Sequence, residues 1–183
     1  MVTISRDAPC LYLTAVAKDR LPVFRTDALK KIACDALSEA RQSGNFFIFA
    51  YVIMPDHLHV LTDGSRKTSE VLRFAKGIRS HRIIGYLKEQ GYESSLKKLR
   101  HEKQARQYKY SLWEHHSNVM LLTSESTFMQ RVHYTHQNPV RAGLVERAQE
   151  YRWSSVRCWS GHMMEDEPLV VDIDQIKWRS GKA

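Results

Sequence analysis

The segment that most constrains the fold of this chain is residues 51–64, Tyr-Val-Ile-Met-Pro-Asp-His-Leu-His-Val-Leu-Thr-Asp-Gly. Its flanks are rich in β-branched and aromatic residues, which favour strands. Pro55-Asp56 is a turn signal, because proline presets one backbone angle and aspartate bonds its own backbone two residues on. A strand should therefore resume at His57, and alternation along it points His57 and His59 to the same face. Two neutral imidazoles on one face make half of a metal site.

The pattern on either side of this turn predicts a split βαβ arrangement. A strand is expected at 11–17, a helix from Thr26 to Gly44, and further strands at 46–54 and 57–62. Strand, helix, strand, turn and strand in this order open a ferredoxin-like fold. The expected fold class is α+β, a ferredoxin-like (split βαβ) antiparallel sheet with helices on one face, plus a C-terminal extension.

Further elements are predicted downstream from hydrophobic periodicity, capping residues and charge. They are a helix from Thr68 or Ser69 to about Gly91, a basic loop at 94–110, a strand at 118–123 and a helix from Ser124 or Ser126 to about Gln137. The loop is expected to be mobile or ordered by a partner. The last helix should bend or end at Asn138-Pro139, because the residue before a proline disfavours the helical conformation.

The length and composition indicate one globular domain. The chain has 183 residues, of which 43% are hydrophobic and 26% charged, and this balance excludes wholesale disorder. Residues 1–160 are expected to form the domain and residues 161–183 a C-terminal tail of uncertain order.

The charge of the chain points to a polyanionic partner. Lys and Arg number 28 against 20 Asp and Glu, a formal net charge of +8, and the sequence pI is near 9.5. Nucleic acid is favoured over a membrane, since no apolar run approaches the ~18 residues of a membrane span. The three cysteines are far apart and show no disulfide or metal-binding spacing, which favours a reducing, cytoplasmic setting.

A second half of the metal site is predicted at the end of the last helix. Tyr134 and Asn138 are four residues apart and share a helix face. If this helix packs near His57 and His59, two imidazole nitrogens and one amide oxygen would suit Mg²⁺ or Mn²⁺, with phosphate oxygens and water at the remaining positions. Tyr134 would then be a nucleophile placed beside a metal-bound phosphodiester.

Each of these residues also has a structural interpretation. A His-x-His pair in a strand is usually a packing or surface feature, and a tyrosine in a helix is usually a core residue. A run of basic residues is usually a solvated face. Aromatic residues interleaved with that charge favour a path for single-stranded DNA instead. The candidate DNA-binding residues are Arg73, Lys76, Arg79, Arg82, Arg106, Trp113 and Arg141.

The chain resembles the single-tyrosine HUH transposases (IS200-like), and within them the REP-associated tyrosine transposases. The family motif Tyr-x-x-Met-Pro-Asn/Asp-His-x-His stands here as residues 51–59. The motif Tyr-Ile-His-x-Asn-Pro-Val-Arg/Lys-Ala-Gly-Leu-Val stands here as residues 134–145, with Thr135 in place of isoleucine. Residues 151–155, Tyr-Arg-Trp-Ser-Ser, match a further family segment, and the resemblance covers roughly residues 10–160.

This resemblance implies a ferredoxin-like catalytic domain that acts on hairpin-bearing single-stranded DNA, in this branch the repetitive extragenic palindromes of bacteria. His57 and His59 would be metal ligands, Asn138 a third ligand, and Tyr134 the nucleophile that forms a 5′-phosphotyrosine link. A monomer is expected rather than a homodimer. Two alternatives stay open: a transposase-derived protein that only binds hairpin DNA, and a metal-dependent phosphodiesterase that uses water.

Overall fold

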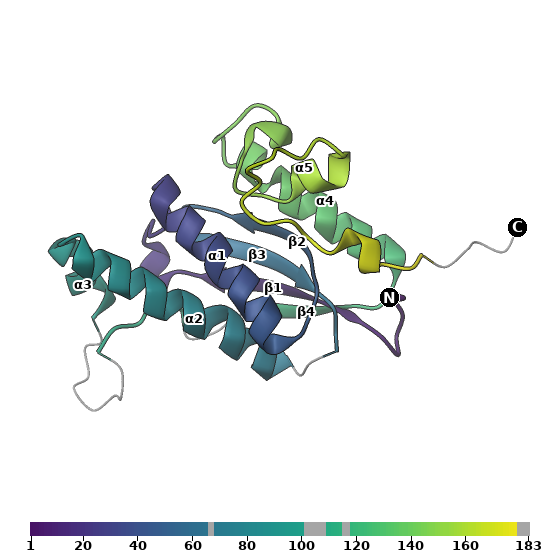
Figure 1. The fold of residues 1–183 in the computed structure, drawn as a ribbon, viewed down its shortest axis with the longest axis horizontal. Coiled ribbons are helices and arrows are strands. Elements are labelled where there is room, and N and C mark those ends of the chain that lie inside the picture. The colour runs from purple at the N-terminus through teal and green to yellow at the C-terminus, as the bar shows by residue number, and fades with distance from the viewer. Residues whose placement is uncertain (66–67, 101–108, 115–117, 179–183) are drawn as a thin grey trace, which may run out of the picture.

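The computed structural model describes residues 1–65, 68–100, 109–114 and 118–178. The described residues form a four-stranded antiparallel sheet with the order β2-β3-β1-β4 (Figure 1). Its strands are β1 (Cys10–Val16), β2 (Ile48–Ile53), β3 (His57–Thr62) and β4 (Asn118–Leu122). This order, with a helix between β1 and β2 and another between β3 and β4, is that of a ferredoxin-like fold. The predicted α+β fold class is confirmed.

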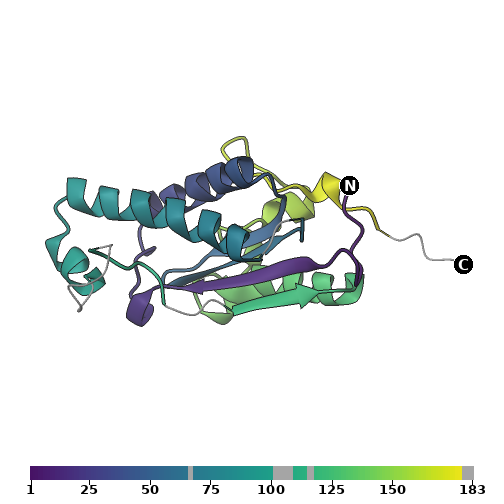
Figure 2. The same cartoon turned by 90° about the horizontal axis from the view of Figure 1, so that it is seen from below.

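Helices cover both faces of the sheet. The helices are α1 (Asp27–Gly44), α2 (Thr68–Glu89), α3 (Glu93–Leu99), α4 (Glu125–Arg141) and α5 (Val156–Ser160), with short 3₁₀ turns at Lys18–Arg20, Ala148–Glu150 and Ile173–Gln175. Helices α1 and α2 pack together on one face, as expected, whereas α4 lies across the other (Figure 2). The expected helix layer is therefore present on one face of the sheet, and α4 forms a second helix layer on the other face, which the sequence pattern did not indicate.

The two faces of the sheet carry separate hydrophobic clusters. Successive side chains of a strand point to opposite faces, so Leu11 and Leu13 of β1 join the cluster with α1 and α2. Tyr12 points the other way and joins a smaller cluster that includes Phe128 and Val132 of α4. This smaller cluster fixes α4 against the sheet.

Helix α4 was predicted to bend or end at Asn138-Pro139, and it does not end there. The helix runs through Pro139 to Arg141, and Pro139 is buried. Proline removes only one backbone N–H from the helix, and the following turn is closed by the N–H of Ala142, which donates to the Asn138 carbonyl (2.9 Å). Gly143, which has a φ of 68°, then reverses the chain.

The basic stretch 94–110 was expected to be a loop, and its first part is helical instead. Helix α3 buries Leu96 and Leu99, which are three residues apart and so share one face beneath the basic side chains. Residues 101–108, including Arg106, lie outside the described residues.

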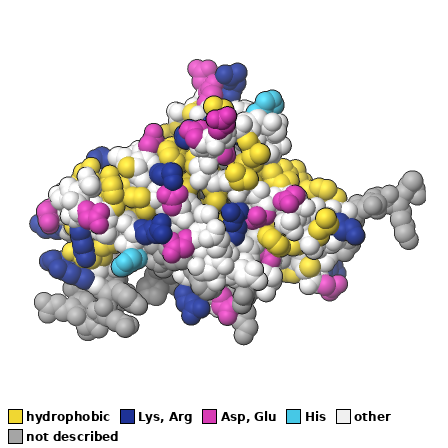
Figure 3. All heavy atoms as spheres, in the orientation of Figure 1, with side chains coloured by type: hydrophobic (Ala, Val, Ile, Leu, Met, Phe, Trp, Pro, Cys, Tyr) yellow, Lys and Arg dark blue, Asp and Glu magenta, His cyan; other side chains and the backbone are white. Residues whose placement is uncertain are grey.

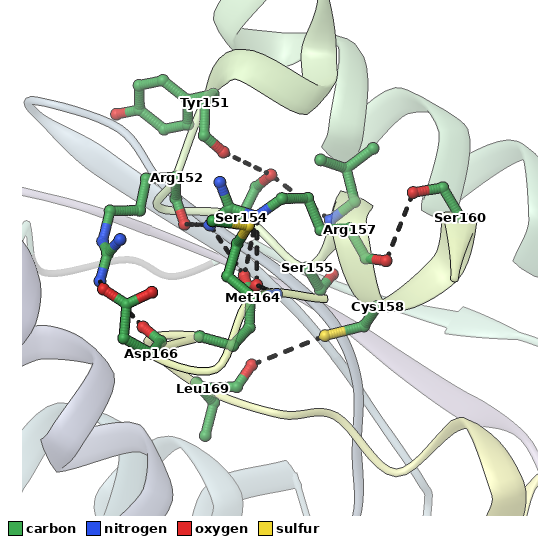
Figure 4. Close-up of polar contacts among 12 residues, drawn as sticks. Tyr151, Arg152, Ser154, Ser155, Arg157, Cys158, Ser160, Met164, Asp166 and Leu169 are labelled. Atoms are coloured by element: carbon green, nitrogen blue, oxygen red, sulfur yellow. Dashed lines mark hydrogen bonds and ion pairs between the residues drawn. The ribbon is translucent and has the colours of Figure 1, made fainter. Parts of the chain in front are cut away.

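The segment expected to be a C-terminal tail packs onto the domain as far as it is described. Arg157 pairs with Glu167 (3.0 Å) and Arg152 with Asp166 (2.6 Å), in the network that Figure 4 shows. Further on, the N–H of Asp172 donates to the carbonyl of Ile48 in β2 (2.8 Å). The segment therefore covers part of the free edge of β2. No described helix is long and apolar enough to cross a membrane.

Trp113 is a core residue, so the prediction that it contacts DNA is wrong. Only 7% of its surface is exposed, and its ring stacks on Phe24 with centroids 5.6 Å apart. A ring held in this way has no free face on which a base could stack.

We expect Gly64→Ala to lower the free energy of unfolding by about 1–3 kcal/mol, as overpacking usually does. A Cβ at Gly64 would lie 2.1 Å from the carbonyl oxygen of Pro9, which is backbone and cannot swing away. Gly85 in α2 is the matched control, because a Cβ there meets nothing within 4 Å. Gly85→Ala should raise stability by about 0.5–1 kcal/mol through helix propensity. Urea unfolding measures both, and equal values for the two variants would contradict this packing.

We expect Trp113→Ala to lower the free energy of unfolding by about 3–5 kcal/mol, the usual cost of truncating a buried tryptophan. Trp178, which is 41% exposed, is the control, and Trp178→Ala should cost clearly less. Chemical denaturation of both variants is the measurement. If Trp113→Ala leaves the free energy of unfolding nearly unchanged and weakens DNA binding, Trp113 is a DNA-contacting residue after all.

Candidate active site

His57 and His59 lie on the face of the sheet that α4 covers. In the β1–β3 register His59 is opposite Thr14 and His57 is opposite Val16. Both imidazoles therefore point to the same side, as predicted, with ring centroids 5.0 Å apart and planes 75° apart. Because alternate residues of one strand share a face, β3 by itself brings the two rings together.

Each imidazole uses its Nδ1 atom in a hydrogen bond to the protein. His57 Nδ1 donates to Oδ1 of Asp56 (2.6 Å), and Asp56 also pairs with Arg20 (3.1 Å). His59 Nδ1 lies 2.8 Å from the hydroxyl of Tyr12 and 2.9 Å from the hydroxyl of Thr14. When Nδ1 carries the proton, these oxygens accept it and Nε2 keeps a lone pair for a metal ion.

The surroundings keep His59 neutral and Asp56 charged. Burial, followed by the nearby His57 and Arg131, lowers the pKa of His59 to about 3. Burial acts to raise the pKa of Asp56, but the hydrogen bonds and charges of His57 and Arg20 outweigh it and leave that pKa below its usual value. A neutral imidazole and an imidazole backed by a carboxylate are the forms that bind metals.

Helix α4 places Tyr134 and Asn138 at the same pocket. The Tyr134 and His59 rings meet edge to face with centroids 5.8 Å apart. Asn138 donates from Nδ2 to the carbonyl of Tyr134 (2.9 Å), one turn back, so Oδ1 is the amide atom left for a ligand role. Both residues line an open pocket of about 630 Å³ together with His57 and His59. The four residues singled out from the sequence thus meet around one cavity.

The donor set fits a divalent ion with open coordination positions. Among the described residues no group of three or more His, Cys, Asp and Glu side chains could hold a metal ion. Two imidazole nitrogens with fixed second partners and one amide oxygen leave room for phosphate and water, as Mg²⁺ and Mn²⁺ prefer.

Several residues that line the pocket were not predicted from the sequence, and three of them contact the predicted residues directly. Tyr12 and Thr14 of β1 hold His59, and Arg131 of α4 lies over the rings of Tyr12 (5.2 Å) and Tyr134 (5.6 Å). Two sequence patterns could have indicated them. Alternation in Leu11-Tyr-Leu-Thr14 puts Tyr12 and Thr14 on one face of a strand, and the three-residue spacing puts Arg131 and Tyr134 on one face of a helix. Both become informative only when the strand and helix neighbours are known.

Of the predicted DNA-binding residues, Arg141 lies beside the pocket. Its guanidinium sits 5.3 Å from the centre of the Tyr134 ring, and its side chain is exposed. Arg106 lies outside the described residues, as do the side chains of Lys76 and Arg79 within α2.

Of the basic side chains predicted to bind DNA on α2, those of Arg73 and Arg82 are described, and neither lines the pocket. Arg73 and Arg82 are exposed on α2, across the sheet from His57 and His59 (Figure 2). Arg82 pairs with Glu39 of α1, and acidic and basic side chains are interspersed on this face (Figure 3). The sheet itself separates these arginines from the pocket.

Comparison with known proteins agrees with this arrangement. The family described as "Transposase IS200 like" matches residues 11–138. A protein of Haemophilus influenzae named as a REP-associated tyrosine transposase is 26% identical over 147 residues, which are 79% of this chain and 77% of that protein. The solved structure of a REP-associated tyrosine transposase bound to a REP hairpin has the same fold, with a TM-score of 0.61 at 17% identity over 90% of this chain and 87% of that one. The chain belongs to the IS200-like transposase family, and its resemblance to the REP-associated tyrosine transposases is confirmed.

Proposed function

We propose that the chain cleaves and rejoins single-stranded DNA next to hairpins, with Tyr134 as the nucleophile. The observation that carries the proposal is the meeting of Tyr134 with His57, His59 and Asn138 at one pocket. Among the described residues that line the pocket there is no aspartate or glutamate, while Arg20 and Arg131 line it, which favours a phosphodiester.

The proposed strand transfer needs no external energy source, because each phosphate ester bond that breaks is replaced by another. The phenol oxygen of Tyr134 attacks the scissile phosphorus and its proton passes to solvent. The bond from phosphorus to the 3′ oxygen breaks, and that oxygen takes a proton to become a free 3′ hydroxyl. The phosphate stays on the 5′ side as a phosphotyrosine ester, so attack by a 3′ hydroxyl reverses the step and rejoins a strand.

His57, His59 and Asn138 would hold a Mg²⁺ or Mn²⁺ ion through two Nε2 atoms and one Oδ1 atom. Such an ion supplies charge that polarises the phosphoryl group and stabilises the departing oxygen. Asp56, Tyr12 and Thr14 fix the two rings, so the ligand atoms need not reorganise when DNA binds.

We propose hairpin-bearing single-stranded DNA as the partner and a monomer as the working unit. The net charge of +8 favours a polyanion, and the solved neighbour is bound to a REP hairpin. All four proposed catalytic and ligand residues come from one chain, so a second copy is not needed to complete the pocket. On the same grounds we propose that the protein acts in the cytoplasm, in association with the nucleoid.

We expect Tyr134→Phe to abolish the covalent adduct with a labelled hairpin oligonucleotide in Mg²⁺ or Mn²⁺, a loss of roughly 10³-fold or more. Denaturing gel electrophoresis of the protein–DNA product is the measurement. Tyr92, 44% exposed and remote from the pocket lining, is the control, and Tyr92→Phe should form adduct at the normal rate. Adduct from Tyr134→Phe would remove Tyr134 as nucleophile. Free ends without any wild-type adduct would favour the phosphodiesterase, and tight binding without cleavage would favour a binding protein.

We expect His59→Ala to abolish Mn²⁺ binding and Asp56→Ala to weaken it about 10–100-fold, the usual effect of removing the partner of a ligand histidine. Titration calorimetry with Mn²⁺ on the free protein measures this without relying on activity. Asp35, which pairs with Lys31 on α1, is the matched acidic control, and Asp35→Ala should bind normally. Undiminished Mn²⁺ affinity in His59→Ala would place the ion elsewhere.

A further inference from the structure

Arg131 lies in the corner between two phenol rings. It precedes Tyr134 by three residues on α4 and so shares its face of the helix. Its guanidinium carbon is 5.2 Å from the centre of the Tyr12 ring and 5.6 Å from that of Tyr134. The two rings are themselves nearly perpendicular, at 82°, with centroids 6.5 Å apart. Cation–π contacts to both rings hold the guanidinium in place.

The charge of Arg131 has no counter-ion among the described residues. Arg20 lines the same pocket and is neutralised by Asp56 (3.1 Å), whereas no described carboxylate is within ion-pair distance of Arg131. Arg131 is also half-buried, unlike the exposed Arg141. A partly desolvated guanidinium with a fork of free donors is suited to a bidentate anion such as phosphate.

Arg131 lies close both to a proposed metal ligand and to the proposed nucleophile. Through Tyr12 it is next to His59, because the Tyr12 ring stacks on His59 (5.4 Å, 13°) and its hydroxyl bonds His59 Nδ1. Through its other contact it is next to Tyr134. An anion bound by this guanidinium is therefore placed between a candidate metal ligand and the nucleophile.

We propose that Arg131 is a catalytic residue that binds a non-bridging oxygen of the scissile phosphate and orients it for attack by Tyr134. This inference rests on the proposed function. Arg141 is the comparison residue: it is exposed, ends the helix, and has its guanidinium 5.3 Å from the centre of the Tyr134 ring.

The first test is single-turnover adduct formation at saturating hairpin oligonucleotide. Arg131→Met should slow the step roughly 10²–10³-fold, as loss of one preorganised donor does, with little change in DNA affinity. Arg131→Lys, which keeps the charge without the fork, should recover part of the rate. Arg141→Met should weaken DNA affinity. Arg25→Met, on an exposed arginine outside the pocket lining, controls for loss of charge alone.

The second test places sulfur at each non-bridging position of the scissile phosphate. For the wild type, sulfur at the position facing Arg131 should slow the reaction, and Mn²⁺ should not restore the rate. Sulfur at a metal-bound position should also slow the reaction, but there Mn²⁺ should restore the rate. The penalty at the position facing Arg131 should vanish in Arg131→Met and shrink in Arg131→Lys, whose near-conservative side chain guards against a folding defect. An unchanged penalty, or an unchanged rate, in both variants overturns the role of Arg131. If the wild type itself forms no adduct, the proposed function fails first.

Discussion

The antiparallel pairing of β1 with β3 is the constraint on which the rest of the site depends. Its register sets Thr14 opposite His59 and places Tyr12 on the same face of the sheet, so β3 carries the two imidazoles and β1 carries the hydroxyl partners of His59. A slip of one residue would turn the imidazoles into the core under α1 and α2 and expose Leu58. The hydrophobic alternation that drives folding thus also orients the polar residues.

Helix α4 completes the site because it packs on the face that α1 and α2 leave open. Phe128 and Val132 are buried against the sheet, and Arg131, Tyr134 and Asn138 of the same helix line the pocket with the imidazoles. The described residues that line the pocket include cations and hydroxyls and no carboxylate, a charge that is complementary to a nucleic-acid backbone. One face of α4 is buried against the sheet and stabilises the fold, and another face lines the pocket where we propose that phosphate binds.

Local patterns predicted well what local forces decide. Alternation and turn chemistry located β2 and β3, and the Thr26 cap and apolar spacing located α1. The errors arose where packing outweighs local preference. Pro139 lies inside α4, which is packed against the sheet. Burial of Leu96 and Leu99 stabilises a helix in a basic stretch. Trp113 is buried in the core, where its ring stacks on Phe24.

The sequence by itself determined that His57 and His59 share one face, that Tyr134 and Asn138 share another, and which family motifs these residues complete. Those relations follow from strand and helix periodicity, which act within a few residues. Only the tertiary structure decided that the two faces meet, that Arg131 joins them, and that α2 lies across the sheet from the pocket. Contacts between residues far apart in the chain depend on which hydrophobic faces bury one another, and no local pattern records that choice.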